Sequence, residues 1–79
     1  MKDRIVIYSS PSCMKCRMLM NKLDTLKIKY IKEDKQDEVN NASGESGLLT
    51  LPIIRVERLD KIEWFDYSSF SEYIIGGTA

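Results

Sequence analysis

The sequence predicts an α/β fold: a small, four-stranded mixed sheet with flanking helices, in the order β-α-β-α-β-β-α. Three observations predict it. An almost unbroken apolar run, Arg4–Tyr8, is followed by a turn and then by an amphipathic helical pattern. A second apolar run after that pattern implies a parallel pair of strands joined by a right-handed crossover. Near the C-terminus, two strand patterns separated by a short turn precede another helical pattern, which is typical of a hairpin followed by a helix.

The first strand and the first helix have the clearest patterns. Arg4–Tyr8 is rich in β-branched residues, which suits a strand buried on both faces. After the turn at residues 9–12, apolar side chains recur at helical spacing, so one face of a helix is expected to meet a core. The apolar stripe comprises Cys16, Leu19, Met20, Leu23 and Leu26, and the opposite face carries Lys15, Arg17, Lys22 and Asp24.

The middle of the chain is predicted with less regular patterns. Ile28–Lys32 is expected to form the second strand. Gln36–Ser43 predicts a short, poorly packed helix, with a loop as the alternative, because it contains only two apolar residues. Leu51–Glu57 is expected to form a strand that begins at a proline. Arg58–Lys61 is then a turn, and Ile62–Phe65 returns antiparallel as a hairpin.

The last helix has a recognisable beginning and end. Asp66 can cap its N-terminus, and Phe65 and Phe70 occupy the two positions of a hydrophobic staple. Gly76 and Gly77 are expected to end it. Its buried face is expected to comprise Tyr67, Phe70, Tyr73 and Ile74.

Length and charge narrow the classes of function. The 79 residues are expected to form one domain, residues 1–79. The chain has a formal net charge of zero. It therefore lacks the positive electrostatic field that general nucleic-acid or membrane binding requires, so these functions are not expected. The only apolar run near the N-terminus, Ile5–Tyr8, is shorter than the ~7–15 apolar residues of a signal peptide, so we expect a cytoplasmic protein. We also expect it to be a monomer. The charge is uneven: nine Lys/Arg and four acids in residues 1–35, against three and eight in residues 36–79.

Both cysteines of the chain, Cys13 and Cys16, lie in the segment SSPSCMKCRM. A structural zinc site needs four protein ligands, and the chain has two cysteines and no histidine. A structural disulfide across so short a loop gives only about 2 kcal/mol, and cytosolic reductants oppose it. Two unrelated buried cysteines are a further alternative. A redox-active pair with no bound metal is the interpretation that the surroundings favour.

The position of the pair gives each cysteine a distinct expected role. Cys13 lies where a strand ends and a helix begins, so unpaired N–H groups of the first turn can point at its sulfur. The helix macrodipole contributes only ~0.3–1 kcal/mol, so Lys15, Arg17 and direct N–H···S bonds must supply the rest. No acidic residue stands between positions 4 and 24. We therefore expect Cys13 to be the exposed thiol that attacks first, and Cys16, one turn inward, to be the resolving thiol.

A second motif, Thr50-Leu51-Pro52, opens the third strand. With CMKC after the first strand and a final helix that opens at Asp66 after a hairpin, nearly the whole chain resembles the thioredoxin superfamily. It is most similar to glutaredoxins and to NrdH redoxins, the glutaredoxin-like electron donors of ribonucleotide reductase. The resemblance implies that the Leu51–Pro52 bond is cis and faces the cysteines. It also implies that the backbone of Leu51 pairs with an extended substrate segment or with glutathione.

Two positions differ from the glutaredoxin pattern. Glutaredoxins typically have CPYC, whereas CMKC is closer to NrdH redoxins, with Met14 in the exposed first position. The Gly-Gly that glutaredoxins carry before the acidic cap is replaced by Glu63-Trp64 or Trp64-Phe65. Trp64 is expected to be a hairpin aromatic that covers the core; the alternative is an exposed partner-docking patch beside Met14.

The resemblance also implies binding roles for residues around the cysteines. Asp66 could receive the amino group of glutathione in addition to capping a helix. Arg55 and Lys35 could hold a glutathione carboxylate, with solvated strand-edge charges as the alternative. The residues expected to contact substrate are Met14, Lys15, Thr50, Leu51, Pro52, Trp64 and Asp66.

These observations predict a small thiol–disulfide oxidoreductase that reduces protein disulfides, with ribonucleotide reductase as a partner that the resemblance suggests. It needs no bound cofactor, and glutathione or a thioredoxin-reductase-type flavoenzyme would return it to the dithiol. The alternative from another class is a soft-metal carrier, because two thiolates can hold Cu(I) and heavy-metal-binding domains also place a CxxC between a first strand and a first helix. A third alternative is an Fe–S cluster that bridges two chains with glutathione.

Overall fold

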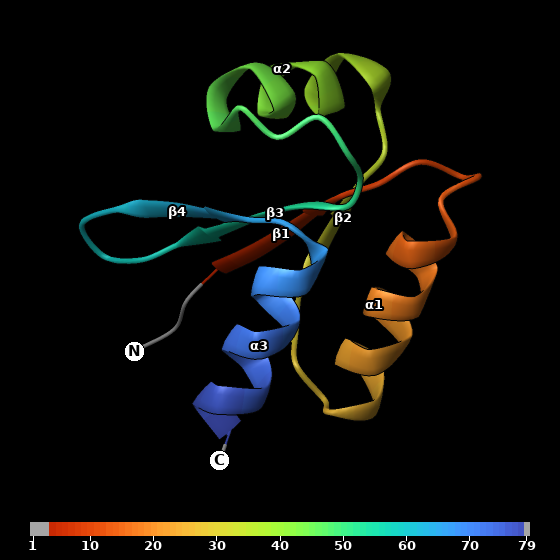
Figure 1. Cartoon of the computed structure of the whole chain (residues 1–79). Helices are drawn as coiled ribbons and strands as arrows, with labels where there is room; N and C mark the ends of the chain where they lie inside the picture. Colours follow the sequence, from red (N-terminus) through yellow and green to blue (C-terminus); the bar gives the residue numbers. More distant parts are fainter. Residues whose placement is uncertain (1–3, 79) are drawn as a thin grey trace.

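The computed structural model describes the backbone of residues 4–78 and the side chains of residues 4–74. A four-stranded sheet, with strand order β2-β1-β3-β4, lies between two layers of helix (Figure 1). β1 pairs with β2 in parallel and with β3 antiparallel, and β3 pairs antiparallel with β4. The predicted order β-α-β-α-β-β-α is confirmed. In chain order the elements are β1 (Arg4–Tyr8), α1 (Met14–Thr25), β2 (Ile31–Glu33), α2 (Gln36–Ser46), β3 (Ile53–Glu57), β4 (Ile62–Phe65) and α3 (Tyr67–Thr78).

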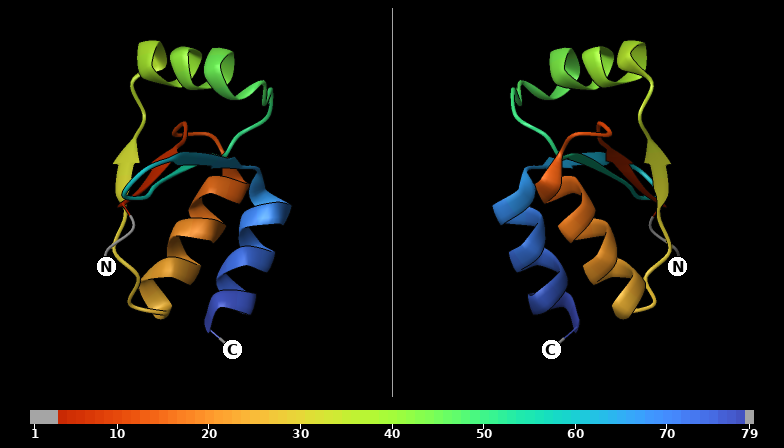
Figure 2. Two further views of the ribbon diagram at one scale, coloured as in Figure 1. Left: turned by 90° about the vertical axis from the view of Figure 1, so that its left-hand side faces the viewer. Right: turned by 90° about the vertical axis from the view of Figure 1, so that its right-hand side faces the viewer.

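Each face of the sheet has its own hydrophobic cluster. α1 and α3 lie side by side on one face, and α2 covers the other (Figure 2). Successive side chains of a strand point to opposite faces, so β1 contributes alternate residues to both clusters, and its nearly continuous apolar sequence follows from this double burial. The first cluster contains Ile5, Ile7, Leu19, Leu23, Ile54, Val56, Phe70 and Ile74, and the second contains Val6, Tyr8, Val39, Ala42 and Ile53.

The apolar stripe of α1 is largely confirmed. Cys16, Leu19 and Leu23 are buried, and Met20 packs half-buried against the cluster that Leu19 and Leu23 join. Leu26, in contrast, is 44% exposed. The prediction that it belongs to the stripe is wrong because Leu26 is the C-cap residue of α1, where the chain already leaves the helix axis.

The end of α1 displaces the second strand. Lys27 has a left-handed backbone, with φ of 59°, and the N–H of Ile28 donates to the carbonyl of Leu23 at 2.9 Å. This is the hydrogen bonding of a helix that ends in a left-handed turn. Ile28 lies in this turn, outside the strand, and its side chain packs against the first hydrophobic cluster. The predicted strand at Ile28–Lys32 is therefore shifted, and β2 is Ile31–Glu33.

α2 is a true helix, so the loop alternative is wrong. It extends three residues beyond the predicted end at Ser43, to Ser46. Val39 and Ala42, its two apolar residues, are buried against the sheet. Gly47, with φ of 78°, ends the helix in the left-handed conformation that glycine adopts most easily.

The N-terminus of α3 is built as predicted. The N–H of Ser69 donates to Oδ1 of Asp66 at 2.8 Å, which satisfies one of the unpaired donors of the first turn. The rings of Phe65 and Phe70 lie 5.7 Å apart, so the hydrophobic staple is confirmed. β4, at Ile62–Phe65, also has its predicted bounds, whereas β3 begins at Ile53 and not at the predicted Leu51, because Pro52 has no N–H to donate to the sheet.

The C-terminal half of α3 differs from the prediction at its end. The helix continues through Gly76 and Gly77 to Thr78. Glycine lowers helix stability by about 1 kcal/mol relative to alanine but does not forbid helical dihedral angles, so the pair does not end the helix. Ala79, the end of the predicted tail, lies outside the described residues. Of the predicted buried face, Phe70 and Ile74 are buried, while Tyr67 and Tyr73 are half-buried and pack against the same cluster.

Among residues 4–78, no helix combines the length and apolar character needed to cross a membrane.

Candidate functional site

Cys13 and Cys16 are joined by a disulfide bond, so the structure describes the oxidised form. Their Cα atoms are 5.3 Å apart, within the range of about 4.4–6.8 Å over which a disulfide can form. Their environments differ. Cys13 is partly exposed, whereas Cys16 lies in the buried stripe of α1 with no exposed surface. An incoming thiolate or disulfide can therefore reach the sulfur of Cys13 and not that of Cys16.

Cys13 is the N-cap residue of α1. Its backbone is extended, with φ of −85° and ψ of 108°, and its Sγ accepts a hydrogen bond of 3.1 Å from the N–H of Cys16. Its carbonyl accepts the N–H of Arg17 at 3.3 Å, which begins the helical hydrogen bonding. The first turn holds no acidic residue. The predicted position at the start of the helix is confirmed, and the donor aimed at Sγ would favour a thiolate there once the disulfide is reduced.

The beginnings of α1 and α3 are in contact through Lys15. Its Nζ lies 6.0 Å from the centre of the Tyr67 ring, a distance suited to a weak cation–π interaction. Lys15 is exposed and stands two residues from Cys13. Sequence periodicity gives no sign of this pair, because the two residues belong to helices far apart in the chain. The contact keeps a positive charge near the end of α1 that carries the disulfide.

The register of the sheet brings the segments that lead to the CMKC motif and from the TLP motif to the same end of the sheet. Tyr8, the last residue of β1, pairs with Ile53, the first residue of β3. The chain that leads to Cys13 therefore leaves the sheet where Pro52 enters it. Pro52 is buried, and the Leu51–Pro52 peptide bond is cis, as the resemblance implied. That Pro52 faces the cysteines stays a prediction.

Asp66 and Thr50 lie near the same end of the sheet. Phe65 pairs with Ile54, so Asp66 leaves β4 beside the start of β3. The backbone and side-chain hydrogen bonds of Ser69 hold the pKa of Asp66 below its usual value. The carboxylate is thus ionised and already engaged as a helix cap. Thr50 is exposed.

Comparison with known proteins finds similarity in structure. No protein-family model matches the chain, and no curated protein matches it in sequence. Mitochondrial thioredoxin 3 from Saccharomyces cerevisiae, in its oxidised form, has a TM-score of 0.65 and 14% identity over 94% of this chain and 77% of its own. Spinach chloroplast thioredoxin f, short form, has a TM-score of 0.67 and 16% identity over 99% and 78%. A chain in the complex of ferredoxin:thioredoxin reductase and thioredoxin f2 has a TM-score of 0.67 and 14% identity over 99% and 79%.

The chain has the thioredoxin fold. The resemblance to the thioredoxin superfamily predicted from CMKC and TLP is thus confirmed for the fold. At 14–16% identity the similarity concerns the arrangement of the backbone. The function of this chain must therefore be argued from its own site.

Within this thioredoxin fold, Trp64 lies on the face of the sheet that α2 covers. It is half-buried, packs against the second cluster, and its ring is 6.2 Å from that of Tyr8. Met14 begins α1, which covers the opposite face. The prediction of a hairpin aromatic over the core is confirmed. A docking patch of Trp64 with Met14 stays a prediction.

Arg55 occupies the same face as Trp64. Its guanidinium carbon lies 5.8 Å from the centre of the Tyr8 ring and 5.9 Å from that of Trp64, and its Nη2 is 2.7 Å from Oε2 of Glu57. The prediction of a solvated strand-edge charge is wrong for Arg55 because the strand order places β3 inside the sheet. Burial raises the pKa of the Tyr8 hydroxyl, and the Arg55 charge opposes this rise. Lys35, the N-cap residue of α2, is exposed as predicted.

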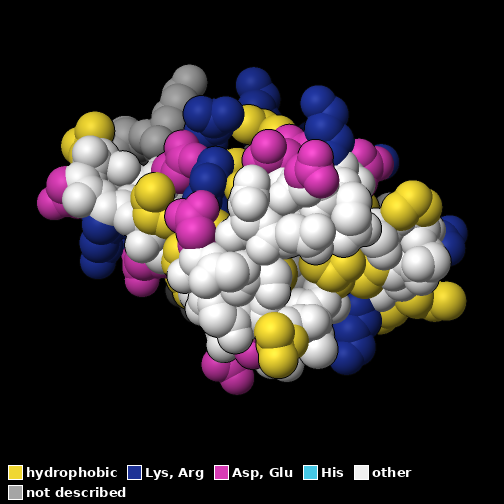
Figure 3. Space-filling model, turned by 90° about the horizontal axis from the view of Figure 1, so that it is seen from above, with side chains coloured by type: hydrophobic (Ala, Val, Ile, Leu, Met, Phe, Trp, Pro, Cys, Tyr) yellow, Lys and Arg dark blue, Asp and Glu magenta, His cyan; other side chains and the backbone are white. Residues whose placement is uncertain are grey.

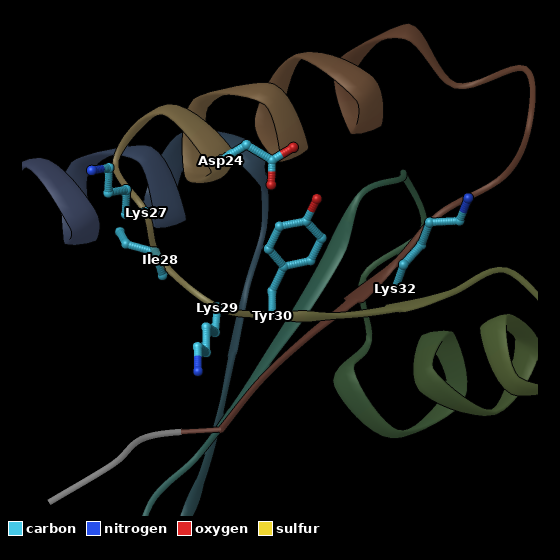
Figure 4. Close-up of a pocket in the computed structure, with 6 residues that line it drawn as sticks. All are labelled: Asp24, Lys27, Ile28, Lys29, Tyr30 and Lys32. Atoms are coloured by element: carbon cyan, nitrogen blue, oxygen red, sulfur yellow. The ribbon is translucent and has the colours of Figure 1, made fainter.

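A separate hollow of about 640 Å³ lies at the far end of α1. Its lining begins at Asp24, which at 1.5 Å per residue is about 16 Å along the helix from Cys13. In Figure 4 the carboxylate of Asp24 points toward the hydroxyl of Tyr30, and the three lysines point in different directions. Burial and a hydrogen bond with Asp24 raise the pKa of Tyr30. The hollow is therefore remote from the cysteines and its charges do not converge. The residues that line it are Asp24, Lys27, Ile28, Lys29, Tyr30 and Lys32.

Proposed function

We propose that this chain is a thiol–disulfide oxidoreductase that reduces disulfides of other proteins. The observation that carries the proposal is the asymmetry of the pair at the start of α1. Cys13 is accessible and its Sγ accepts an amide hydrogen bond, whereas Cys16 is buried one turn away within bonding distance. A pair built only for stability has no need of one reachable sulfur with a donor aimed at it.

The reaction proceeds in two exchanges. In the reduced protein, the Cys13 thiolate attacks one sulfur of a substrate disulfide, forms a mixed disulfide and displaces the other substrate sulfur as a thiolate, which takes a proton. Cys16, after losing its proton to solvent, attacks Sγ of Cys13 and displaces the second substrate thiolate. The substrate gains two electrons and two protons, and the protein is left with the Cys13–Cys16 disulfide seen in the structure.

The N-cap position favours release as well as attack. If the pKa of Cys13 falls from about 8.5 to about 7, its thiolate fraction at pH 7 rises roughly 16-fold. The lower basicity reduces intrinsic nucleophilicity about fivefold, so the net gain in attack rate is only about threefold. A more acidic thiol is also a better leaving group, which speeds the second exchange, in which Cys13 is displaced.

The finer assignment is to a redoxin of the glutaredoxin or NrdH type, supported by CMKC and by the order of elements at the site. The exposed Thr50, the backbone of Leu51 and the buried Pro52 precede β3 at the end of the sheet where β1 leads toward Cys13, and an extended substrate segment would pair with the Leu51 backbone there. Met14 and Lys15 directly follow Cys13 in the chain. We propose ribonucleotide reductase as one candidate substrate, and glutathione or a thioredoxin-reductase-type flavoenzyme as the external reductant. The cytoplasm, whose reductants maintain such carriers, is the proposed location.

Insulin reduction tests the proposed function. Wild-type protein is expected to accelerate the reduction of insulin by dithiothreitol, and Cys13→Ser is expected to abolish the acceleration. Activity that survives Cys13→Ser would contradict the mechanism. NADPH consumption with the glutathione system and with thioredoxin reductase, each in turn, identifies the reductant. A Cu(I) titration of the reduced protein tests the alternative of a metal carrier, which requires tight binding and no insulin reduction.

A further inference from the structure

The outer face of α1 combines exposed methionines with cations. Met14 and Met18 lie one turn apart and are 66% and 52% exposed. At 100° per residue, Arg17 lies about 60° to one side of Met14, and Lys15 and Lys22 lie about 80–100° to the other. All three cations are exposed. Figure 3 shows hydrophobic and Lys/Arg side chains next to each other on its right-hand side, where α1 and the segment before it lie.

No acid among residues 4–74 forms an ion pair with these three cations. None of the ion pairs in the described part of the chain uses Lys15, Arg17 or Lys22, and no acidic residue occurs in the first turn of α1. The helix bears its only acid at Asp24, near its far end. The cations that do form ion pairs are Arg4, Lys32, Arg55, Arg58 and Lys61. The outer face of α1 is thus a positively charged rim around two flexible apolar side chains.

We propose that this face docks an acidic segment of the substrate protein, in which carboxylates flank an apolar side chain close to the disulfide. The inference rests on the proposed function and names its substrate class. Opposite charge on the substrate complements the cations, and unbranched methionines adapt to apolar side chains of different shape. Met14 directly follows Cys13, so a segment bound along α1 brings its disulfide beside the reactive sulfur. Charge of this kind acts mainly on the rate of encounter, so it shows in kcat/KM and in its salt dependence.

A second copy of the chain is the competing occupant. Residues 36–79 carry eight acids and three Lys/Arg, so they could face α1 of another molecule. A substrate is favoured because the rim lies beside the sulfur that must remain reachable, and self-association there would cover it. Sedimentation at low ionic strength distinguishes the two occupants.

Two peptides provide the direct test. Both carry the same intramolecular disulfide beside a leucine; one has glutamates flanking it and the other has glutamines. The rate constant for reduction by the reduced protein is expected to be about tenfold higher for the acidic peptide at ~0.01 M salt, where charges act over about 30 Å. The ratio is expected to fall toward one at ~1 M salt, where they act over about 3 Å.

Matched variants locate the effect on α1. Lys22→Glu is expected to lower the ratio of acidic to neutral rate constants about fivefold at low salt. Lys61→Glu makes the same change in net charge in the β3–β4 turn and is expected to change the ratio less than twofold. Met18→Ser is expected to slow both peptides about threefold, whereas Leu59→Ser, at an 85% exposed position of that turn, is expected to leave both rates unchanged. Melting temperatures of the four variants verify that each is folded.

The outcomes separate this inference from the proposed function. Reduction of both peptides at equal rates, with a ratio independent of salt, overturns the docking inference and leaves the oxidoreductase intact. Dimers at low salt that Lys22→Glu dissociates, together with equal peptide rates, assign the face to a second copy and also overturn it. If neither peptide nor insulin is reduced, the proposed function itself has failed.

Discussion

The backbone N–H of Cys16 donates a hydrogen bond of 3.1 Å to Sγ of Cys13 across the first turn of α1. The partner that closes the disulfide thus also supplies the donor that stabilises the attacking sulfur. Since Cys16 is buried in the α1 stripe, packing of the helix against the sheet fixes the direction of this donor. The core of the fold and the chemistry of the site are therefore coupled through one residue.

Alkylation of the reduced protein should distinguish the two thiols. Iodoacetamide is expected to modify Cys13 at least about tenfold faster than Cys16 at pH 7, because Cys13 is reachable and its thiolate fraction is raised. Mass spectrometry of the digested protein measures both rates. In denaturant the two rates should become equal. Faster modification of Cys16 in the folded protein would reverse the assigned roles.

Lys15 should lower the pKa of the Cys13 thiol through its charge. Lys15 is exposed, so its charge acts through water-like surroundings, where a unit charge contributes about 1 kcal/mol even at 4 Å; Lys15→Gln is therefore expected to raise the pKa by no more than about 0.7. Tyr67→Leu removes the ring beside Nζ of Lys15 and is expected to raise the pKa of the Cys13 thiol by a smaller amount. Tyr67→Phe keeps the ring and is expected to leave this pKa unchanged. Lys22→Gln, about two turns farther along α1, is the matched control. A rise as large in Lys22→Gln would show that the effect does not depend on proximity.

The cap at Asp66 should contribute to stability in a pH-dependent way. Asp66→Ala is expected to lower the free energy of unfolding by about 1 kcal/mol at pH 7, and Asp66→Asn by less, since asparagine also caps. The pKa of Asp66 is lower in the folded chain than in the unfolded one, so the charged cap stabilises fully above the unfolded value of about 3.9 and progressively less as the pH falls through the folded value.

Urea denaturation at pH 7 and near pH 2 measures this loss. Asp60→Ala, at an exposed position of the β3–β4 turn, is the control and is expected to cost less than about 0.5 kcal/mol. If Asp66→Ala lowers the free energy of unfolding by the same amount at both pH values, the cap does not depend on the charge of Asp66, which would contradict this prediction.

Arg55 should stabilise the fold more than an ordinary surface arginine. Arg55→Ala is expected to cost about 2 kcal/mol, because its guanidinium lies near the rings of Tyr8 and Trp64 and pairs with Glu57. Arg4 also pairs with Glu57, but at 3.7 Å and largely in solvent, so Arg4→Ala is expected to cost less than about 0.5 kcal/mol. Urea denaturation measures both variants. Equal losses in the free energy of unfolding for Arg55→Ala and Arg4→Ala would contradict this prediction.

The sequence predicts correctly those elements whose formation depends on interactions between residues close together in the chain. The apolar run of β1, the cap at Asp66 and the staple of Phe65 with Phe70 each depend on residues close in the chain, and each is confirmed. The second strand was displaced because Lys27 takes a left-handed conformation that residues other than glycine rarely adopt, so its sequence gave no warning.

The relations between distant segments could not be predicted in the same way. Arg55 alternates with apolar neighbours in a manner that fits either an edge or an interior strand, and only the strand order decides between them. Trp64 packs against the cluster on the α2 face, and the sequence does not show which face of the sheet each element covers. The contact of Lys15 with Tyr67 joins two helices and has no local pattern.

The proposed mechanism requires that the sulfur of Cys13 be stabilised as an anion at the N-terminus of α1. Titration of the thiolate by its ultraviolet absorbance in Cys16→Ser, which leaves Cys13 as the only cysteine and keeps the backbone N–H of residue 16, tests it most directly. We expect a pKa clearly below the free-cysteine value of about 8.5. A pKa at or above about 8.5 would contradict it.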